Sequence, residues 1–129
     1  GIKIKGTIDR LDLKDSSIYE IIDYKTSSSL KVDTPRTYEK SKDFQLEFYY
    51  IAVNQKYNTT NIKPYYFDLA NTKLLEEITI EKKLEVLREI FDEFKDSSKD
   101  GTIKEVSFNK CEEKATCQYC SYKTICNRD

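Results

Sequence analysis

The chain contains no histidine and no methionine. Without histidine, its own residues cannot form a Ser–His triad, a histidine acid–base catalyst or a Cys₂His₂ zinc site. No apolar run approaches the ~18 residues of a membrane span and no signal peptide is visible, so we expect a cytoplasmic protein with no membrane partner. Methionine is missing even at position 1, and we expect the chain to be an excised part of a longer protein.

An excess of positive charge is also missing. Charged residues make up 35% of the chain, but both signs are mixed, the net charge is −1 and the pI is about 5.7. No overall basic field attracts nucleic acid, so any such binding must use a local patch. The length of 129 residues predicts one domain.

Hydrophobic periodicity predicts the order of the elements. Alternating apolar residues predict a strand over 2–13, broken near Gly6, then a polar turn over 14–17 and a second strand over 18–26. The remaining pattern predicts a mobile loop over 27–36, a helix over 39–57, a third strand over 61–69, a fourth strand over 74–80 and an amphipathic helix over 81–96. Pro64 in the third strand favours an edge strand or a strand start. We therefore expect an α/β core over 1–106, with a small mixed β-sheet flanked by helices, followed by a cysteine-rich tail over 107–129.

Two carboxylates and a lysine are predicted to share one face of the first hairpin. Asp23 and Lys25 are two residues apart on a strand, and a turn centred near Ser16 places Asp9 opposite Asp23. Such a pair of carboxylates suits Mg²⁺ or Mn²⁺, and the lysine can orient a water. The alternative is a surface ion pair, but both acids follow isoleucine, where an unpaired charge entering the core is costly. The same face is predicted to carry apolar side chains inward, namely those of Leu11, Leu13, Tyr19 and Ile21.

Gln45 and Tyr49 are four residues apart on the first predicted helix and therefore share a face. They form either a helix-surface pair or an amide site that holds a water or a phosphate oxygen beside the metal. The apolar stripe of this helix is predicted to consist of Phe44, Phe48, Ile51 and Ala52.

Three motifs in order, G-x-I-D-R-x-D, I-I-D-Y-K-T and Q-x-x-x-Y, resemble the PD-(D/E)XK nuclease superfamily and its RecB/AddB-like exonuclease branch. The resemblance implies a restriction-endonuclease-like core that hydrolyses DNA with Mg²⁺ or Mn²⁺, in repair or recombination, beside helicase or other domains of a longer chain or complex. It implies metal ligation by Asp9, Asp23 and the carbonyl of Tyr24, and a water-positioning role for Lys25. Gln45 and Tyr49 match the helix motif of this branch. Many relatives carry a histidine or glutamate on a helix upstream of the first aspartate, which here would precede Gly1.

Four cysteines fall within sixteen residues of the tail, at Cys111, Cys117, Cys120 and Cys126. Buried thiols or disulfides would explain them, but a C-x2-C pair in an intracellular chain favours zinc or an iron–sulfur cluster. The resemblance favours a [4Fe–4S] cluster over Zn²⁺. Its fourth ligand is either Cys111 or a cysteine upstream of the chain.

Two further functions remain open: a catalytically inactive DNA-binding module with the same fold, and a zinc-stabilised protein interaction domain. Ten tyrosines are present, and four of them could stack on the bases of a single strand or simply pack in the fold, which we favour. These are Tyr65, Tyr66, Tyr119 and Tyr122.

Overall fold

The computed structural model describes residues 3–27, 29–97, 114–121 and 124. The chain divides into two compact units, Gly1–Phe91 and Asp92–Asp129. No helix among the described residues combines the length and the apolar composition that a membrane span requires.

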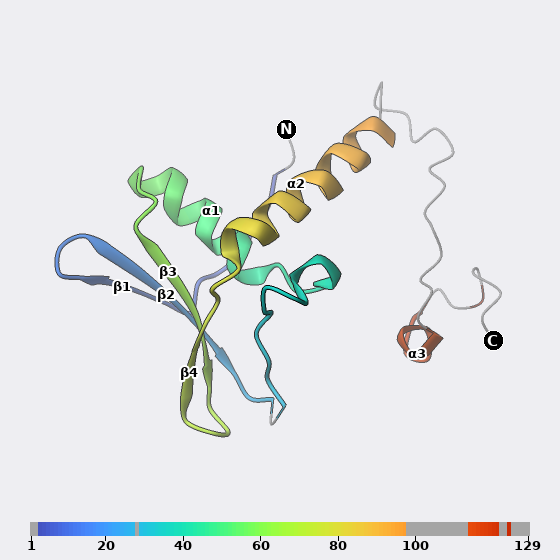
Figure 1. Ribbon diagram of the computed structural model, residues 1–129, viewed down its shortest axis with the longest axis horizontal. Coiled ribbons are helices and arrows are strands. Elements are labelled where there is room, and N and C mark those ends of the chain that lie inside the picture. The colour runs from blue at the N-terminus through green and yellow to red at the C-terminus, as the bar shows by residue number, and fades with distance from the viewer. Residues whose placement is uncertain (1–2, 28, 98–113, 122–123, 125–129) are drawn as a thin grey trace. The chain divides into compact units, whose positions relative to one another are not determined.

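The first unit is built on a four-stranded mixed sheet (Figure 1). Its strands are β1 (Arg10–Lys14), β2 (Ile18–Lys25), β3 (Ile62–Asp68) and β4 (Lys73–Glu76), in the order β1-β2-β3-β4. β1–β2 and β3–β4 are antiparallel, whereas β2 and β3 are parallel, so the chain crosses over between them through α1 (Gln45–Tyr57). The predicted α/β class with a small mixed sheet and flanking helices is confirmed.

The first hairpin turns where its sequence predicts. Leu13 pairs with Tyr19 and Arg10 with Ile22, which centres the hairpin on Ser16. Asp15 and Ser16 have φ values of 47° and 57°, the left-handed conformation that hairpin turns of type I′ require. The predicted strand over 2–13 is too long, because β1 begins only at Arg10 and residues 3–8 have no regular structure.

The first helix is shorter than the predicted span of 39–57. A 3₁₀ turn, η1 (Tyr38–Lys40), comes first, and α1 begins at Gln45. The Asp43 carboxylate accepts a hydrogen bond of 3.0 Å from the Gln45 backbone N–H, which satisfies one of the free donors at the start of the helix. Asn58 ends α1 in the left-handed conformation.

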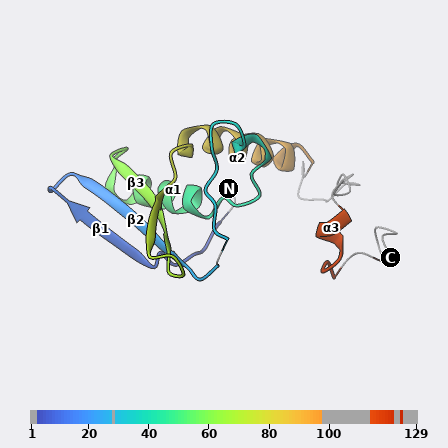
Figure 2. The ribbon, with the colours of Figure 1, turned by 60° about the horizontal axis from the view of Figure 1, so that its bottom comes forward.

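The core lies between one face of the sheet and the helices. Figure 2 shows α1 and the first part of α2 (Ile80–Ser97) on the same side of the sheet. The predicted apolar stripe of α1 is wrong, because Leu46 and Val53 face the core while Phe48 and Ile51 are half-buried and Ala52 is exposed. The buried hydrophobic cluster consists of Ile21, Leu46, Val53, Ile62 and Tyr66.

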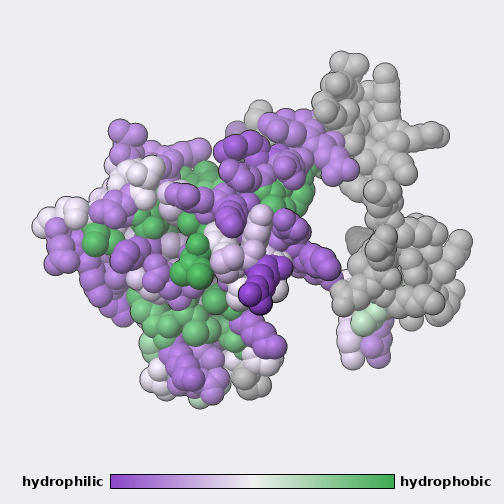
Figure 3. All heavy atoms as spheres, in the orientation of Figure 1, coloured by the Kyte–Doolittle hydropathy of each residue, from purple (hydrophilic) through white to green (hydrophobic). Residues whose placement is uncertain are grey.

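Two other expectations about the strands need correction. Leu13 is 55% exposed, because it lies beside the turn at the tip of the hairpin. β3 is an interior strand and not an edge, and Pro64 instead lies near its start, before pairing with β4 begins at Tyr65. Figure 3 shows apolar residues grouped over β4 on an otherwise largely hydrophilic surface, where Leu69 and Leu74 are about half exposed.

The tyrosines of β3 pack in the sheet, as expected. Tyr65 is 8% and Tyr66 3% exposed, which leaves no ring face for a base. In the second unit Tyr119 is exposed, and Tyr122 lies outside the described residues. That unit contains the end of α2 and the single-turn helix α3 (Lys114–Cys117).

Candidate active site

The candidate site begins at the carboxyl end of β2. Asp23 and Lys25 are two residues apart on this strand and point to the same face, as predicted. The Asp23 side chain is buried, and Lys25 Nζ lies 2.8 Å from its Oδ2. The lysine side chain is 28% exposed, so the buried carboxylate has a partner that solvent and substrate can reach.

Gln45, the first residue of α1, completes this pair. Its Nε2 donates hydrogen bonds to Asp23 Oδ1 at 2.9 Å and to the Tyr49 hydroxyl at 2.8 Å. Its Oε1 accepts a hydrogen bond of 2.5 Å from Lys25 Nζ. The amide is therefore held in the orientation that charge favours, with its oxygen toward the ammonium group and its NH₂ toward the carboxylate. Gln45 and Tyr49 share a helix face, and the structure places that face against the carboxylate.

Asp9 lies just before β1, on the exposed side of the site. Extending the pairing of Arg10 with Ile22 by one residue places Asp9 opposite Asp23. Asp9 Oδ2 accepts a hydrogen bond of 3.0 Å from the Tyr24 backbone N–H, which ties the first motif to the second. The two carboxylates therefore come from neighbouring chain segments at one end of the sheet.

The donor set fits a divalent cation. Lys25 is the ion-pair partner of Asp23 Oδ2, but no hydrogen bond from the described part of the chain reaches this buried oxygen. Carboxylate and carbonyl oxygens of Asp9, Asp23 and Tyr24 are hard ligands of the kind that Mg²⁺ takes with several waters. Among the described residues no cluster of three Asp, Glu, His or Cys side chains is present, so further ligands would be backbone, water or substrate oxygens.

Tyr66 of β3 and Asp43, just before α1, form a second layer of contacts around the site. The Tyr66 ring lies across from Asp23 on β3, and Lys25 Nζ is 5.1 Å from the ring centroid. The Tyr66 hydroxyl donates a hydrogen bond of 2.8 Å to Asp43 Oδ2. Burial and this hydrogen bond raise the pKa of Tyr66 far above its usual value, so the phenol stays protonated. Sequence reasoning missed the pair of Tyr66 and Asp43, because only the parallel crossover brings β3 beside the segment that leads into α1.

A second charged cluster lies in the core, also unpredicted. Lys83 of α2 contacts Glu47 of α1 at 3.2 Å, Glu77 at 3.4 Å and Asp33 at 3.4 Å. Burial raises the pKa of Glu47 to about 7, and the attraction of Lys83 only partly opposes this. Burial alone would lower the pKa of Lys83, but attraction by Glu47, Glu77 and Asp33 raises it. Lys83 lies three residues after Ile80 and four before Leu87, so helical spacing places it on the apolar face of α2, and only its charge argues against burial.

Two of the four predicted cysteine ligands lie in the described part of the tail. Cys117 and Cys120 are free thiols of intermediate exposure, and the Cys120 N–H donates to the Cys117 carbonyl at 3.1 Å. Cys111 and Cys126 lie outside the described residues. The C-x2-C pair therefore occupies a turn at the end of α3.

Comparisons with known proteins agree with this geometry at the level of the family. The family model of the PD-(D/E)XK nuclease superfamily matches residues 1–127. No curated protein and no solved structure gave a match. A match over nearly the whole length, with the aspartate, D-x-K and glutamine motifs meeting at one site, shows that the chain belongs to the PD-(D/E)XK nuclease superfamily.

Proposed function

We propose that this chain hydrolyses DNA phosphodiester bonds with a divalent cation, Mg²⁺ or Mn²⁺. The observation that carries the proposal is the hydrogen-bonded set of Asp23, Lys25 and Gln45, with Asp9 opposite on the first hairpin. A fold that only bound DNA would gain nothing from a buried carboxylate held between a lysine and a glutamine amide.

Each residue has a separate task in this reaction. Asp9, Asp23 and the Tyr24 carbonyl would hold the cation, which lowers the pKa of a bound water and offsets the charge of the scissile phosphate. Lys25 orients the attacking water and stabilises the negative charge that develops on the phosphate oxygens. Gln45 fixes both Asp23 and Lys25, and the Tyr49 hydroxyl fixes the amide of Gln45.

The helix motif and the tail support a narrower assignment. Q-x-x-x-Y at Gln45 and Tyr49, together with the cysteine spacing, favours a RecB/AddB-like exonuclease of DNA repair or recombination, working with helicase or other domains. In this proposal Cys117, Cys120 and Cys126 bind a [4Fe–4S] cluster, with Cys111 as the fourth ligand. Anaerobically purified protein should then be brown with about four irons per chain. Colourless protein with one zinc would replace the cluster by zinc, and metal-free protein with two disulfides would exclude both.

Cleavage of end-labelled DNA in Mg²⁺, compared between Asp23→Asn and Asp12→Asn, tests the catalytic proposal. Both substitutions remove one carboxylate charge from the same hairpin, but Asp12 pairs with Arg10 on the opposite face. We expect Asp23→Asn to lose cleavage while Asp12→Asn keeps it. Equal rates in both variants would contradict the site, and DNA binding without cleavage by the unaltered chain would indicate a binding module.

A further inference from the structure

Asp43, two residues before Gln45, uses both of its carboxylate oxygens. Its Oδ1 accepts a hydrogen bond of 3.0 Å from the Gln45 backbone N–H, and its Oδ2 accepts one of 2.8 Å from the Tyr66 hydroxyl. Asp43 is exposed, whereas Tyr66 is only 3% exposed, so this carboxylate connects a surface segment to an interior strand. Asp43 therefore joins the start of α1 directly to β3.

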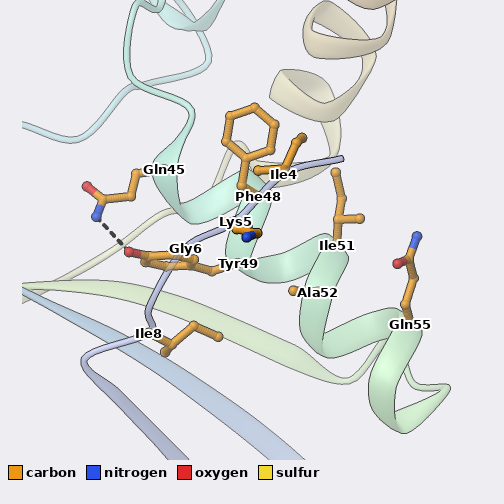
Figure 4. Close-up of a pocket in the computed structure, with 10 residues that line it drawn as sticks. All are labelled: Ile4, Lys5, Gly6, Ile8, Gln45, Phe48, Tyr49, Ile51, Ala52 and Gln55. Atoms are coloured by element: carbon orange, nitrogen blue, oxygen red, sulfur yellow. Dashed lines mark hydrogen bonds between the residues drawn. The ribbon is translucent and has the colours of Figure 1, made fainter. Parts of the chain in front are cut away.

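The contact between Asp43 and α1 differs from an ordinary helix cap. A capping side chain belongs to the residue just before the helix and accepts a hydrogen bond from the second or third helical N–H. That residue is Phe44 here, which makes no such bond, and Asp43 instead reaches the first helical residue, Gln45. The Gln45 side chain contacts Asp23 and, as Figure 4 shows, Tyr49. The bond from Asp43 therefore fixes the backbone of a residue of the candidate active site.

Tyr66 reaches the same site from the sheet. It lies opposite Asp23 on the neighbouring parallel strand, and its ring centroid is 5.1 Å from Lys25 Nζ. Lysine has a flexible four-carbon side chain, so its ammonium group keeps one position only where contacts hold it. Asp23 and Gln45 provide two of these contacts, and the face of the Tyr66 ring provides another. The hydroxyl bond to Asp43 in turn fixes the ring.

The contacts close on themselves. They run from Lys25 to Asp23, Gln45, Asp43, Tyr66 and back to Lys25. The members come from β2, from β3 and from the start of α1, and each is held from two sides. Breaking any one link leaves two members held from one side only, so the network restrains its members more than separate pairs would.

We propose that Asp43 and Tyr66 are positioning residues for the reaction, which hold Gln45 and Lys25 in place. The inference rests on the proposed nuclease function and adds two residues that act through others. A displacement of about 1 Å among reacting groups can slow a reaction about 100-fold. Loss of either residue should therefore lower the rate of cleavage and leave the affinity for DNA unchanged.

Asp43→Ala tests the proposal, with Glu39→Ala as its control. Glu39 is an exposed carboxylate in the segment before α1, and it also accepts a hydrogen bond from a tyrosine hydroxyl, that of Tyr38. Single-turnover cleavage of end-labelled DNA in Mg²⁺ measures the rate, and fluorescence anisotropy in EDTA measures the affinity for DNA. We expect Asp43→Ala to slow cleavage about tenfold with an affinity within about twofold of the unaltered chain, and Glu39→Ala to change neither.

Two further variants separate positioning from charge and from folding. Asp43→Asn loses the charge, but its amide can accept from the Gln45 N–H and donate to the Tyr66 hydroxyl, so it should keep about half of the rate or more. Tyr66→Phe breaks the same link from β3 and should also slow cleavage, but adding it to Asp43→Ala should cost nothing more. An Asp43→Asn variant as slow as Asp43→Ala, or multiplied losses in the double variant, would overturn the proposal. If Asp43→Ala does not fold, an unchanged rate in Tyr66→Phe would overturn it.

The Gln45 side-chain amide provides a measurement that does not depend on cleavage. Its isotopically labelled NH₂ group, assigned by its absence in Gln45→Ala, should change NMR frequency in Asp43→Ala and keep it in Glu39→Ala. An unmoved signal in Asp43→Ala would contradict the positioning role, whatever the rate. A moved signal in a chain that cuts no DNA would support the positioning role and contradict the nuclease proposal alone.

Discussion

Two lysines of this chain lie among carboxylates, and their surroundings differ. Lys25 pairs with Asp23 and Gln45 at the end of β2, where its side chain is 28% exposed. Lys83 pairs with Glu47, Glu77 and Asp33 between α1 and α2, where its side chain is 2% exposed. The first cluster opens to solvent at a chain segment carrying a further carboxylate, Asp9. The second, which we call the sealed cluster, is buried except for Asp33, whose side chain is 24% exposed.

The contrast distinguishes a charged cluster suited to a reaction from one that is part of the packed core. A strongly shifted pKa in a carboxylate is a common sign of a functional site, and here it belongs to Glu47 in the sealed cluster. No substrate can reach Glu47, which is fully buried, so its shifted pKa reports the cost of burying charge. The partly exposed Lys25 and the neighbouring carboxylate of Asp9 identify the site at Asp23 better than the pKa shift does, since the buried oxygens of Glu47 also lack hydrogen bonds.

Removing Lys83 should have the largest effect. Lys83→Met leaves Glu47 and Glu77 buried without their counter-charge, and we expect a loss of about 3–5 kcal/mol in the free energy of unfolding. Urea denaturation at pH 7 measures it. Lys82→Met, at the exposed neighbouring position, should change the free energy by less than about 1 kcal/mol. Similar stabilities for the two variants would mean that the sealed cluster is not structural.

Removing Lys25 should affect the reaction and leave the fold intact. Lys25→Ala is expected to slow Mg²⁺-dependent DNA cleavage by at least about 100-fold, the effect of losing a group that stabilises developing charge. Asp23→Ala should abolish cleavage. Rates come from single-turnover assays, with Lys14→Ala on the same hairpin as the control, since Lys14 pairs with Glu20 on the opposite face. Unaltered cleavage by Lys25→Ala would remove this lysine from the mechanism.

The sealed cluster should give stability a distinctive pH dependence. Burial raises the pKa of Glu47 from 4.5 to about 7, so folding favours its protonated form and its contribution to stability is lost as pH rises from about 4.5 to 7. Glu47→Gln removes this titration. Relative to the unaltered chain, the variant should gain on the order of 2 kcal/mol between pH 5 and 8, measured by urea denaturation. A constant difference between the two curves would show that Glu47 does not titrate in this range.

Gln45→Ala should have a smaller effect than the changes above. The side chain is only partly buried, so we expect a change in unfolding free energy within about 1 kcal/mol. Cleavage should fall by about tenfold or more, because Lys25 and Asp23 lose the amide that fixes them. Tyr49→Phe removes only the hydroxyl behind that amide and should cost less. A large loss of stability with normal cleavage would make Gln45 a structural residue.

Local pattern was a good guide where neighbours in the chain decide the structure. The turn residues around Ser16 set the hairpin register, and the register sets which side chains face Asp23. The pattern was wrong for α1, where Phe48, Ile51 and Ala52 repeat at helical spacing but do not form the buried face. Periodicity shows that a helix has an apolar side, and it cannot choose between two such sides when Leu46 and Val53 provide another.

The sequence by itself determined the order of the elements, the shared face of Asp23 and Lys25, the shared face of Gln45 and Tyr49, and the membership of the nuclease superfamily. These depend on spacing along one strand or one helix, which backbone geometry fixes. Tertiary structure decided the meeting of α1 with β2, the support of the site by Tyr66 and Asp43, and the burial of Lys83. Those contacts join residues from different elements, and they form only when the parallel crossover packs α1 against the sheet.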